Sequence, residues 1–242
     1  MNISPCLELE NIERSILKVC DHIDNKRENL EWHNFSEEQL WYELVSCILG
    51  SQIQYETAKG CITHLIEKKL LDIQKILISP DEVKEKISRE LSKPIYPPFV
   101  GNKGCRYRYP NSKAKYIVET CLEIYNNKSC LRLILDGCSD AHEAREILIK
   151  KCMGIGPKQA SLFLRNISYC EDLAIIDSHV IDFIRLMELN KKINSRSIVN
   201  KSQYLMNEEI LLSYADGKDK TLASLDLAIW VVMRLVKKEF VL

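Results

Sequence analysis

Apolar residues recur at helical spacing along most of this 242-residue chain, and that spacing constrains the fold more than any other feature. The pattern i, i+3, i+4, i+7 places apolar side chains on one face of a helix. Only 8 Gly and 7 Pro are present, which disfavours a β fold dense in turns. The chain is therefore predicted to be all-α, with about ten helices. Two segments with this spacing are Ala160, Phe163, Leu164, Ile167 and Val180, Phe183, Ile184, Met187.

Two further segments are predicted to be core helices. Residues 41–49 (WYELVSCIL) are apolar almost all round, which is typical of a central helix. Residues 222–236, within a helix predicted over about 222–238, form the most apolar segment, but Asp226 and Arg234 interrupt it. No run reaches the length that a membrane span requires. We therefore expect no contact with a membrane.

Capping patterns predict where several helices begin. A small polar residue before a helical segment accepts hydrogen bonds from its first N–H groups. Proline suits the first helical position, and an acid three residues after the cap can complete a capping box. The predicted starts are Ser79 before Pro80, Asn111 before a helix over 112–125, and Asp140 with Glu143 before a helix that runs to Cys152.

Charge and cysteine content narrow the class of protein. The 34 basic and 34 acidic residues cancel, which excludes an overall basic coat but not a local basic face. The chain has ten cysteines and no CxxC pair, and we expect no signal peptide. Reduced thiols in an intracellular protein are expected, with no metal and no cofactor. Cys61 and His64 share a helix face, but two ligands do not make a metal site.

Two basic stretches are candidates for contact with nucleic acid. Residues 102–115 carry Lys103, Arg106, Arg108, Lys113 and Lys115, with Tyr107 and Tyr109 between them and no acid. Residues 190–201 carry four more basic residues and no acid. Basic residues beside aromatic ones suit phosphate contact and base stacking. The alternative for each stretch is a solvated loop.

The segment GIGPKQASLFLRN predicts a helix, a two-glycine turn and a second helix. Gly154 can adopt the positive φ that commonly follows a helix end, and Gly156 precedes Pro157 at the next helix start. N–H groups at that start favour a phosphate, and glycine allows its close approach. Such a hairpin would hold the backbone of a nucleic acid without reading its sequence. The alternative is a tight corner between two helices.

Lys158 falls in the first turn of the second helix, where the macrodipole disfavours a cation by roughly 0.3–1 kcal/mol. Local stability therefore does not explain the lysine. A lysine that acts as a nucleophile must be neutral, and a helix N-terminus favours the neutral amine. The alternative is a cationic lysine that binds phosphate. Chemistry alone leaves both open.

Asp177, nineteen positions after Lys158, precedes another apolar-periodic helix and is predicted to be its N-cap. Capping fixes a carboxylate while leaving one oxygen for other use. A fixed carboxylate near a lysine could transfer its proton or stabilise a developing cation. Ser178 and His179, at the same helix start, could meet a second phosphate.

These elements together resemble the helix–hairpin–helix DNA glycosylase superfamily. GIGPKQASLFLRN with AIIDSHVI is most similar to the second Ogg family of 8-oxoguanine DNA glycosylase/AP lyases. WYELVSCILGSQ, YRYPNSKAKYIVET and LDLAIW resemble further segments of that family, so the similarity spans roughly residues 41 to 230.

The resemblance implies an all-α, two-lobed helix–hairpin–helix glycosylase fold with the active site in the cleft between the lobes. Residues 35–168 would form a helical barrel that ends in the hairpin. Residues 1–34 and 169–242 would form the second lobe from both termini. A damaged base would be flipped out of duplex DNA. Lys158 would displace it through a Schiff base followed by β-elimination, and Asp177 would assist.

The resemblance also implies roles outside the hairpin. Gln52 would fill the space left by the flipped base, although a polar loop residue is an equally good reading. Asp226 and Trp230 would contact the base. The carboxylate of Asp226 could instead pair with a protein donor or a helix N-terminus. Trp230 could instead serve only to pack the core. The C-terminal sequence VVMRLVKKEFVL departs from the family, whose members end soon after the tryptophan with a lysine near the base.

The expected function is a bifunctional DNA glycosylase/AP lyase that acts on oxidised guanine in duplex DNA as a monomer. One alternative is the same scaffold with another lesion preference. A second is a non-catalytic DNA-binding protein that uses the hairpin and residues 102–115 as phosphate contacts. Lys158 with Asp177 favours the enzyme, because a protein that only binds gains little from a neutral lysine beside a fixed carboxylate.

Overall fold

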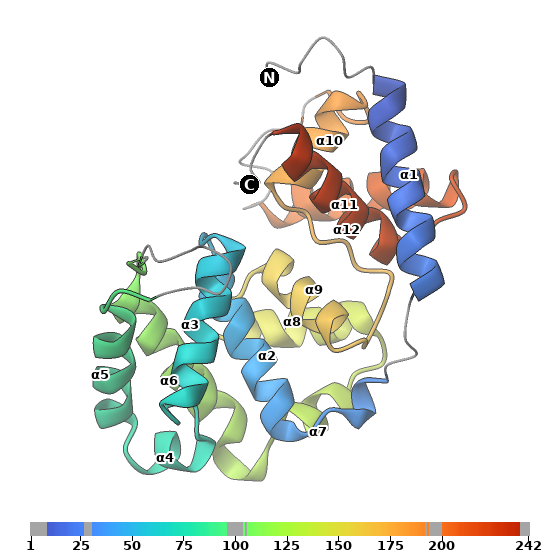
Figure 1. Ribbon diagram of the computed structural model, residues 1–242. Coiled ribbons are helices and arrows are strands. Elements are labelled where there is room, and N and C mark those ends of the chain that lie inside the picture. Colours follow the sequence, from blue (N-terminus) through green and yellow to red (C-terminus); the bar gives the residue numbers. More distant parts are fainter. Residues whose placement is uncertain are drawn as a thin grey trace. The chain divides into compact units, whose positions relative to one another are not determined.

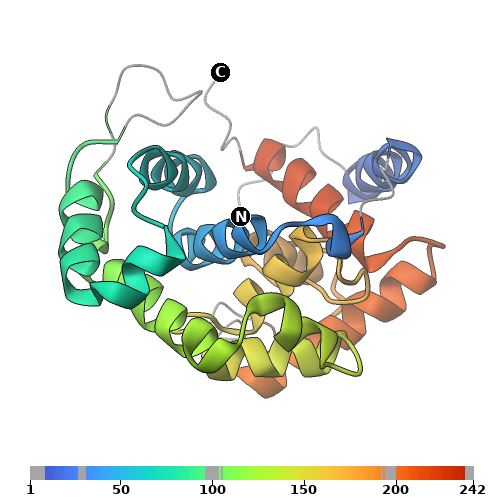
Figure 2. The ribbon, with the colours of Figure 1, turned by 90° about the horizontal axis from the view of Figure 1, so that it is seen from below.

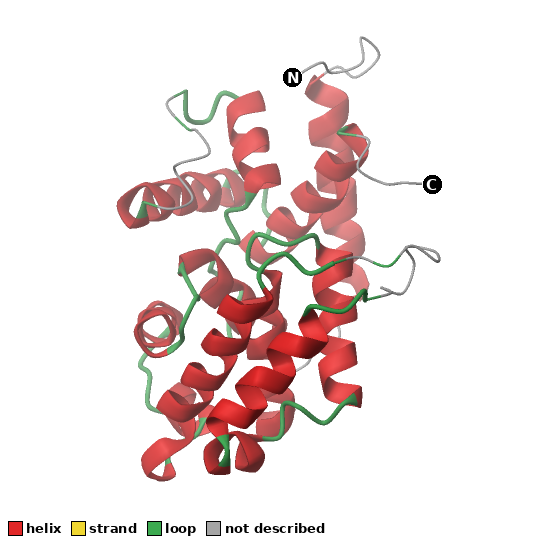
Figure 3. Ribbon diagram, turned by 90° about the vertical axis from the view of Figure 1, so that its left-hand side faces the viewer, coloured by secondary structure: helices red, strands yellow, loops and turns green. Residues whose placement is uncertain are grey.

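The structure of the chain, a computed structural model, describes residues 9–26, 31–95, 104, 106–191, 193 and 200–237, with the backbone alone at 127. These residues contain twelve α-helices, two short 3-10 turns and no strand (Figure 3). The prediction of an all-α fold is confirmed, with two more helices than expected.

The chain divides into two compact units, which Figure 1 shows with the elements labelled. Residues 31–167 form one unit from a continuous piece of chain. Residues 1–30 and 168–242 form the other, so this unit combines the two ends of the sequence.

Helix α2 is central to the continuous unit. It packs against α3, α6, α7 and α9 (Figures 1 and 2), and half of its residues are buried, all of them apolar. The helices of this unit are α2 (Glu37–Gly50), α3 (Tyr55–Glu67), α4 (Ile73–Ile78), α5 (Pro80–Leu91), α6 (Pro110–Tyr125), α7 (Leu131–Asp136), α8 (Ala141–Lys151) and α9 (Pro157–Asn166), with 3-10 turns at Trp32–Asn34 and Asn126–Lys128.

The predicted helix starts have different outcomes. Asp140 caps α8, since its carboxylate accepts from Glu143 N at 2.8 Å. Glu143 accepts from Ser139 N at 2.7 Å, one residue before the partner that a capping box would use. Ser79 lies at the N-cap of α5 but its side chain makes no cap hydrogen bond.

The predicted cap at Asn111 is wrong. Helix α6 begins at Pro110 with Tyr109 in the N-cap position, so Asn111 lies inside the first turn. The fixed φ of proline is already helical, and its missing N–H costs nothing at a helix start. The side chain of Asn111 instead accepts a hydrogen bond from the hydroxyl of Ser88 in α5.

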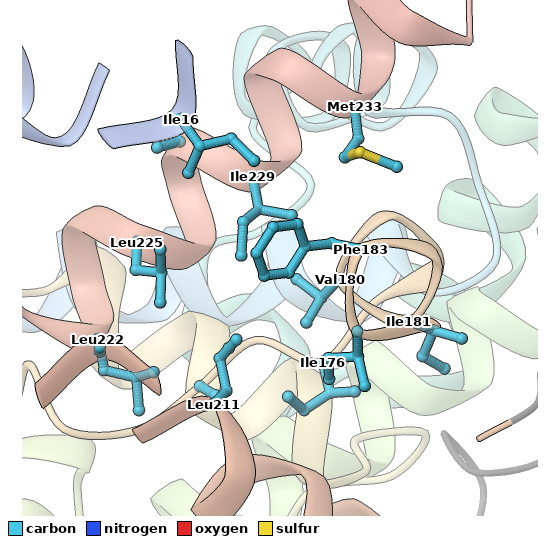
Figure 4. Packing of buried hydrophobic residues seen from close by; sticks show 14 of the residues in the cluster. Ile16, Ile176, Val180, Ile181, Phe183, Leu211, Leu222, Leu225, Ile229 and Met233 are labelled. Carbon is cyan, nitrogen blue, oxygen red and sulfur yellow. The ribbon is translucent and has the colours of Figure 1, made fainter. Parts of the chain in front are cut away.

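The unit built from both ends has a compact apolar core. Helices α1 (Leu9–Lys26), α10 (Ser178–Leu186) and α11 (Lys201–Asp216) all pack against α12 (Leu222–Val236). Phe183 and Ile229 lie in this core with Ile16 and Leu225 (Figure 4). The last helix therefore serves as the core helix that the sequence predicts. Among the residues described, no helix has both the length and the apolar character to cross a membrane.

Candidate active site

The two-glycine turn joins α8 to α9 as predicted. Helix α8 ends at Lys151, and Gly154 adopts a φ of +74°, the left-handed region that favours glycine. Gly156 is the extended N-cap of α9, and Pro157 is the first residue of that helix. The local sequence therefore gives the expected helix–hairpin–helix.

Helix α6 supports the hairpin from one side. A Cβ added to Gly154 would lie 2.4 Å from Cδ2 of Tyr116, so ring and backbone are in direct contact. The buried hydroxyl of Thr120, one turn further along α6, accepts from Met153 N at 2.9 Å. A Cβ on Gly156 would meet nothing within 4 Å. The second glycine therefore leaves open space beside the N-terminus of α9.

Lys158 is the second residue of α9 and is half-buried. Within the described part of residues 31–167, no carboxylate forms an ion pair with it. Burial, reinforced by Glu43, raises the pKa of the Cys47 thiol well above its usual range, and the charge of Lys158 opposes this shift. Lys158 therefore lies near the last turn of α2, where Cys47 is located.

The end of α2 is held by side chains from other elements. The last four carbonyls of a helix lack partners within the helix. Here they are those of residues 47–50, and Gly50 O accepts from Ile53 N at 3.4 Å. The other three accept from a set of side chains that we call the α2 collar: Cys47 O from Gln159 Nε2 at 2.8 Å, Ile48 O from Lys113 Nζ at 2.7 Å, and Leu49 O from the Tyr107 hydroxyl at 2.6 Å.

The loop after α2 carries Gln52 on the surface. Gln52 has a φ of 63°, a conformation that costs a residue with a side chain on the order of 1–2 kcal/mol. Non-glycine residues keep such a conformation where the surrounding structure imposes it, often at functional sites. The loop follows directly from the turn that the α2 collar holds.

Part of the basic stretch 102–115 has a different role from the one predicted. Tyr107 and Lys113 are 4 % and 5 % exposed and belong to the α2 collar, so they are not available to bases or phosphates. Burial lowers the pKa of Lys113 to about 8. Arg106 and Arg108 are exposed, as phosphate contacts must be. Lys103 lies outside the described residues, as does most of the stretch 190–201.

Asp177 caps α10, as predicted. Its Oδ1 accepts from His179 N at 2.8 Å and from Val180 N at 3.0 Å. Its Oδ2 has no hydrogen-bond partner among the residues that the structure describes. Ser178 is exposed, whereas the side chain of His179 is 8 % exposed and its N–H is used by Asp177. A phosphate at this helix start would therefore meet Ser178 rather than His179.

Buried polar side chains hold the segment that leads into Asp177. Asp226 Oδ2 accepts from Ile175 N at 2.9 Å, and Asp226 is only 3 % exposed. Of the partners considered for this carboxylate, a protein donor is therefore present. Glu208 and Tyr204 bind the same segment: Glu208 Oε1 accepts from Ala174 N at 2.9 Å, and the Tyr204 hydroxyl donates to Ala174 O at 2.6 Å and accepts from Ile176 N at 3.3 Å.

Trp230 lies one turn after Asp226 on α12 and is partly exposed. The guanidinium carbon of Arg234 is 4.6 Å from the centre of its ring, within the range of a cation–π contact. One face of the indole is therefore covered by a residue of the same helix. A planar ligand could not stack on that face.

The predicted site residues are distributed over the two units. The continuous unit contains Gln52, Arg106, Arg108, Gly154, Gly156 and Lys158, and the unit built from both ends contains Asp177, Ser178, His179, Asp226 and Trp230. No group of three His, Cys, Asp or Glu side chains in the described part of the chain could hold a metal ion. Chemically, the first unit offers an amine at a helix N-terminus, and the second a fixed carboxylate.

Comparison with known proteins identifies similar chains. Residues 23–219 match a protein family described as 8-oxoguanine DNA glycosylase. An 8-oxoguanine DNA glycosylase/AP lyase of Saccharolobus islandicus is 34% identical over 215 residues, 88% of this chain and 89% of that protein. The solved 8-oxoguanine DNA glycosylase of Thermotoga maritima is 28% identical, with a TM-score of 0.69 and 95% of each chain covered. The solved enzyme of Methanocaldococcus jannaschii is 25% identical, with a TM-score of 0.68, covering 98% of this chain and 100% of that one.

Proposed function

The chain belongs to the 8-oxoguanine DNA glycosylase family, and we propose that it excises 8-oxoguanine from duplex DNA and nicks the strand at the resulting abasic site. The observation that carries this proposal is Lys158, a half-buried amine at the start of a helix with no acidic partner in the described part of its own unit. We expect the protein to act as a monomer inside the cell, without a metal or other cofactor.

Lys158 supplies the nucleophile for both steps. Its neutral Nζ attacks the anomeric C1′ of the flipped nucleotide, and the bond from C1′ to the base nitrogen breaks, so that the base leaves with its electron pair and takes up a proton. The sugar ring opens, and the amine becomes an imine to C1′. Loss of a C2′ proton then breaks the bond from C3′ to its phosphate oxygen, which nicks the strand.

Asp177 assists as a fixed carboxylate. Its Oδ1 is held by two backbone N–H groups of α10, and its Oδ2 has no partner among the described residues. In this proposal Oδ2 stabilises positive charge on the sugar and takes the proton that Lys158 loses.

Groups in both units would contact DNA. The N-terminus of α9 beside Gly156 and the exposed guanidiniums of Arg106 and Arg108 bind phosphates, and Ser178 binds another at the start of α10. Gln52 occupies the space that the flipped base leaves. Trp230 contacts the flipped base.

Borohydride trapping on a duplex that contains 8-oxoguanine tests the proposal. Borohydride reduces the imine to a stable amine, so wild-type protein should become covalently attached to DNA. The Lys158→Gln variant should give no adduct while still binding DNA. Absence of an adduct with wild type would overturn the lyase mechanism, and efficient trapping by the variant would identify a different nucleophile. Cleavage at an abasic site but not at 8-oxoguanine would support the lyase mechanism and show that 8-oxoguanine is not the substrate.

A further inference from the structure

Gln159 follows the nucleophilic lysine directly and anchors the same helical turn. Its side chain is 5 % exposed, and Nε2 donates to Cys47 O of α2 at 2.8 Å. A Cβ on Gly50 would lie 3.8 Å from the same nitrogen, so the amide lies on the last turn of α2. This hydrogen bond joins residues 112 positions apart in the sequence.

Packing alone does not explain a glutamine at this position. Its Oε1 is buried and has no hydrogen-bond donor among the residues that the structure describes. A buried polar atom without a partner destabilises the folded state. Methionine or leucine would cover a similar surface without that cost. What only the amide provides is a directional bond between α9 and α2.

That bond relates two parts of the site. The last turn of α2 leads directly into the loop with Gln52, and the first turn of α9 carries Lys158. The other members of the α2 collar, Tyr107 and Lys113, hold the same turn from α6 and the segment before it. Of the three, only Gln159 ties that turn to the helix of the lysine.

We propose that Gln159 is a positioning residue for Lys158, which fixes the first turn of α9 on α2 so that the amine and the Gln52 loop keep a constant separation. The inference rests on the proposed role of Lys158 as the nucleophile. A displacement of a reacting group by about 1 Å can lower a rate by up to about 100-fold. Loss of the bond should therefore slow the attack on C1′ without removing DNA binding.

The test compares Gln159→Met with Tyr107→Phe. Each substitution keeps a side chain of similar length and leaves one collar carbonyl, of Cys47 or of Leu49, without its side-chain donor. Only the first loosens α9. Single-turnover rates of borohydride trapping are measured at saturating protein on 8-oxoguanine and on abasic duplexes. Binding to a duplex with an uncleavable tetrahydrofuran site and thermal unfolding are measured in parallel.

We expect Gln159→Met to lower both single-turnover rates by about 10- to 100-fold, with the dissociation constant for the uncleavable duplex within about 3-fold of wild type. Tyr107→Phe should lose thermal stability but keep both single-turnover rates within about 3-fold of wild type. A role in stability alone would leave the rate of fully folded Gln159→Met unchanged, which would overturn the inference. If that variant does not fold, Gln159→Leu takes its place under the same criteria. A wild type that traps nothing would overturn the proposed function and this inference together, whereas normal trapping by folded Gln159→Met would overturn the inference alone.

Discussion

Gly154 lies against the ring of Tyr116 so closely that a Cβ on the glycine would be 2.4 Å from Cδ2 of the tyrosine. The same glycine has a φ of +74°. Both backbone conformation and packing therefore require glycine at this position. Gly156, two residues later, meets neither requirement, because its φ is −111° and the space beside it is open.

The two hairpin glycines should therefore respond differently to alanine. Gly154→Ala adds a strained φ and a clash, and we expect it to lower the free energy of unfolding by at least about 1–2 kcal/mol. Gly156→Ala should leave stability nearly unchanged but weaken binding to undamaged duplex DNA, because the methyl group obstructs the N-terminus of α9. Urea unfolding and fluorescence anisotropy measure the two effects. Equal loss of stability in both variants would contradict this account of the hairpin.

Lys113 predicts a pH dependence of stability. Burial lowers its pKa from 10.5 to about 8, so between these values the unfolded chain binds a proton that the folded chain does not. Stability therefore rises with pH in this window, because the unfolded state holds more protons. The neutral amine can still donate to Ile48 O.

The difference in unfolding free energy between wild type and Lys113→Met isolates this effect from other titrating groups. We expect the advantage of wild type to grow from pH 7.5 to about pH 10. Urea titrations at several pH values provide the measurement. An advantage that shrinks over this range would mean that the ammonium form is the stabilising one.

Substitutions of Asp226 can separate its support of the segment before Asp177 from its proposed contact with the base. Its Oδ2 accepts from Ile175 N two residues before Asp177, and an asparagine could accept the same bond. We therefore expect Asp226→Ala to lose about 1–3 kcal/mol of stability and Asp226→Asn to lose less. If the carboxylate also reads the base, Asp226→Asn will lose excision of 8-oxoguanine while cleaving abasic sites normally. If a stable Asp226→Asn protein keeps both activities, Asp226 only supports the segment that leads into Asp177.

Substitution of Trp230 should lower activity only on a substrate that still carries the damaged base. We expect Trp230→Leu to lower the single-turnover excision of 8-oxoguanine by about 10-fold or more, since stacking contributes about 1–3 kcal/mol per base. Cleavage of a duplex that already contains an abasic site should change by less than about 3-fold. Parallel loss on both substrates would indicate that the indole serves the packing of α12 instead.

The parts of the site encoded locally could be predicted from the sequence. Gly154, Gly156 and Pro157 specify the hairpin, and Asp177 specifies a cap, because each signal lies within a few residues of its effect. The α2 collar could not be predicted in this way, since its hydrogen bonds join residues 58, 65 and 112 positions apart. Lys113 therefore looked like a phosphate contact in the sequence but is a buried donor.

Helix α11 illustrates a second limit. Its buried positions include Asn207 and Glu208, so the inward face is partly polar and lacks an apolar repeat. Those polar groups have defined roles within the unit, since Glu208 accepts from Ala174 N. Periodicity of apolar residues detects faces that pack against a core. It does not detect a face that organises a neighbouring segment through hydrogen bonds.

The division of the chain has a consequence for how the protein is made. Residues 31–167 are continuous, so this unit, with Lys158 in it, can fold while the rest of the chain is still on the ribosome. The unit that holds Asp177 must wait for α12, the last helix, against which α1 and α10 pack. Nascent chains would therefore contain the folded hairpin of α8 and α9 before the Asp177 carboxylate is fixed in place. On the proposed roles of Lys158 and Asp177, excision activity should therefore arise only after α12 has been synthesised and has packed.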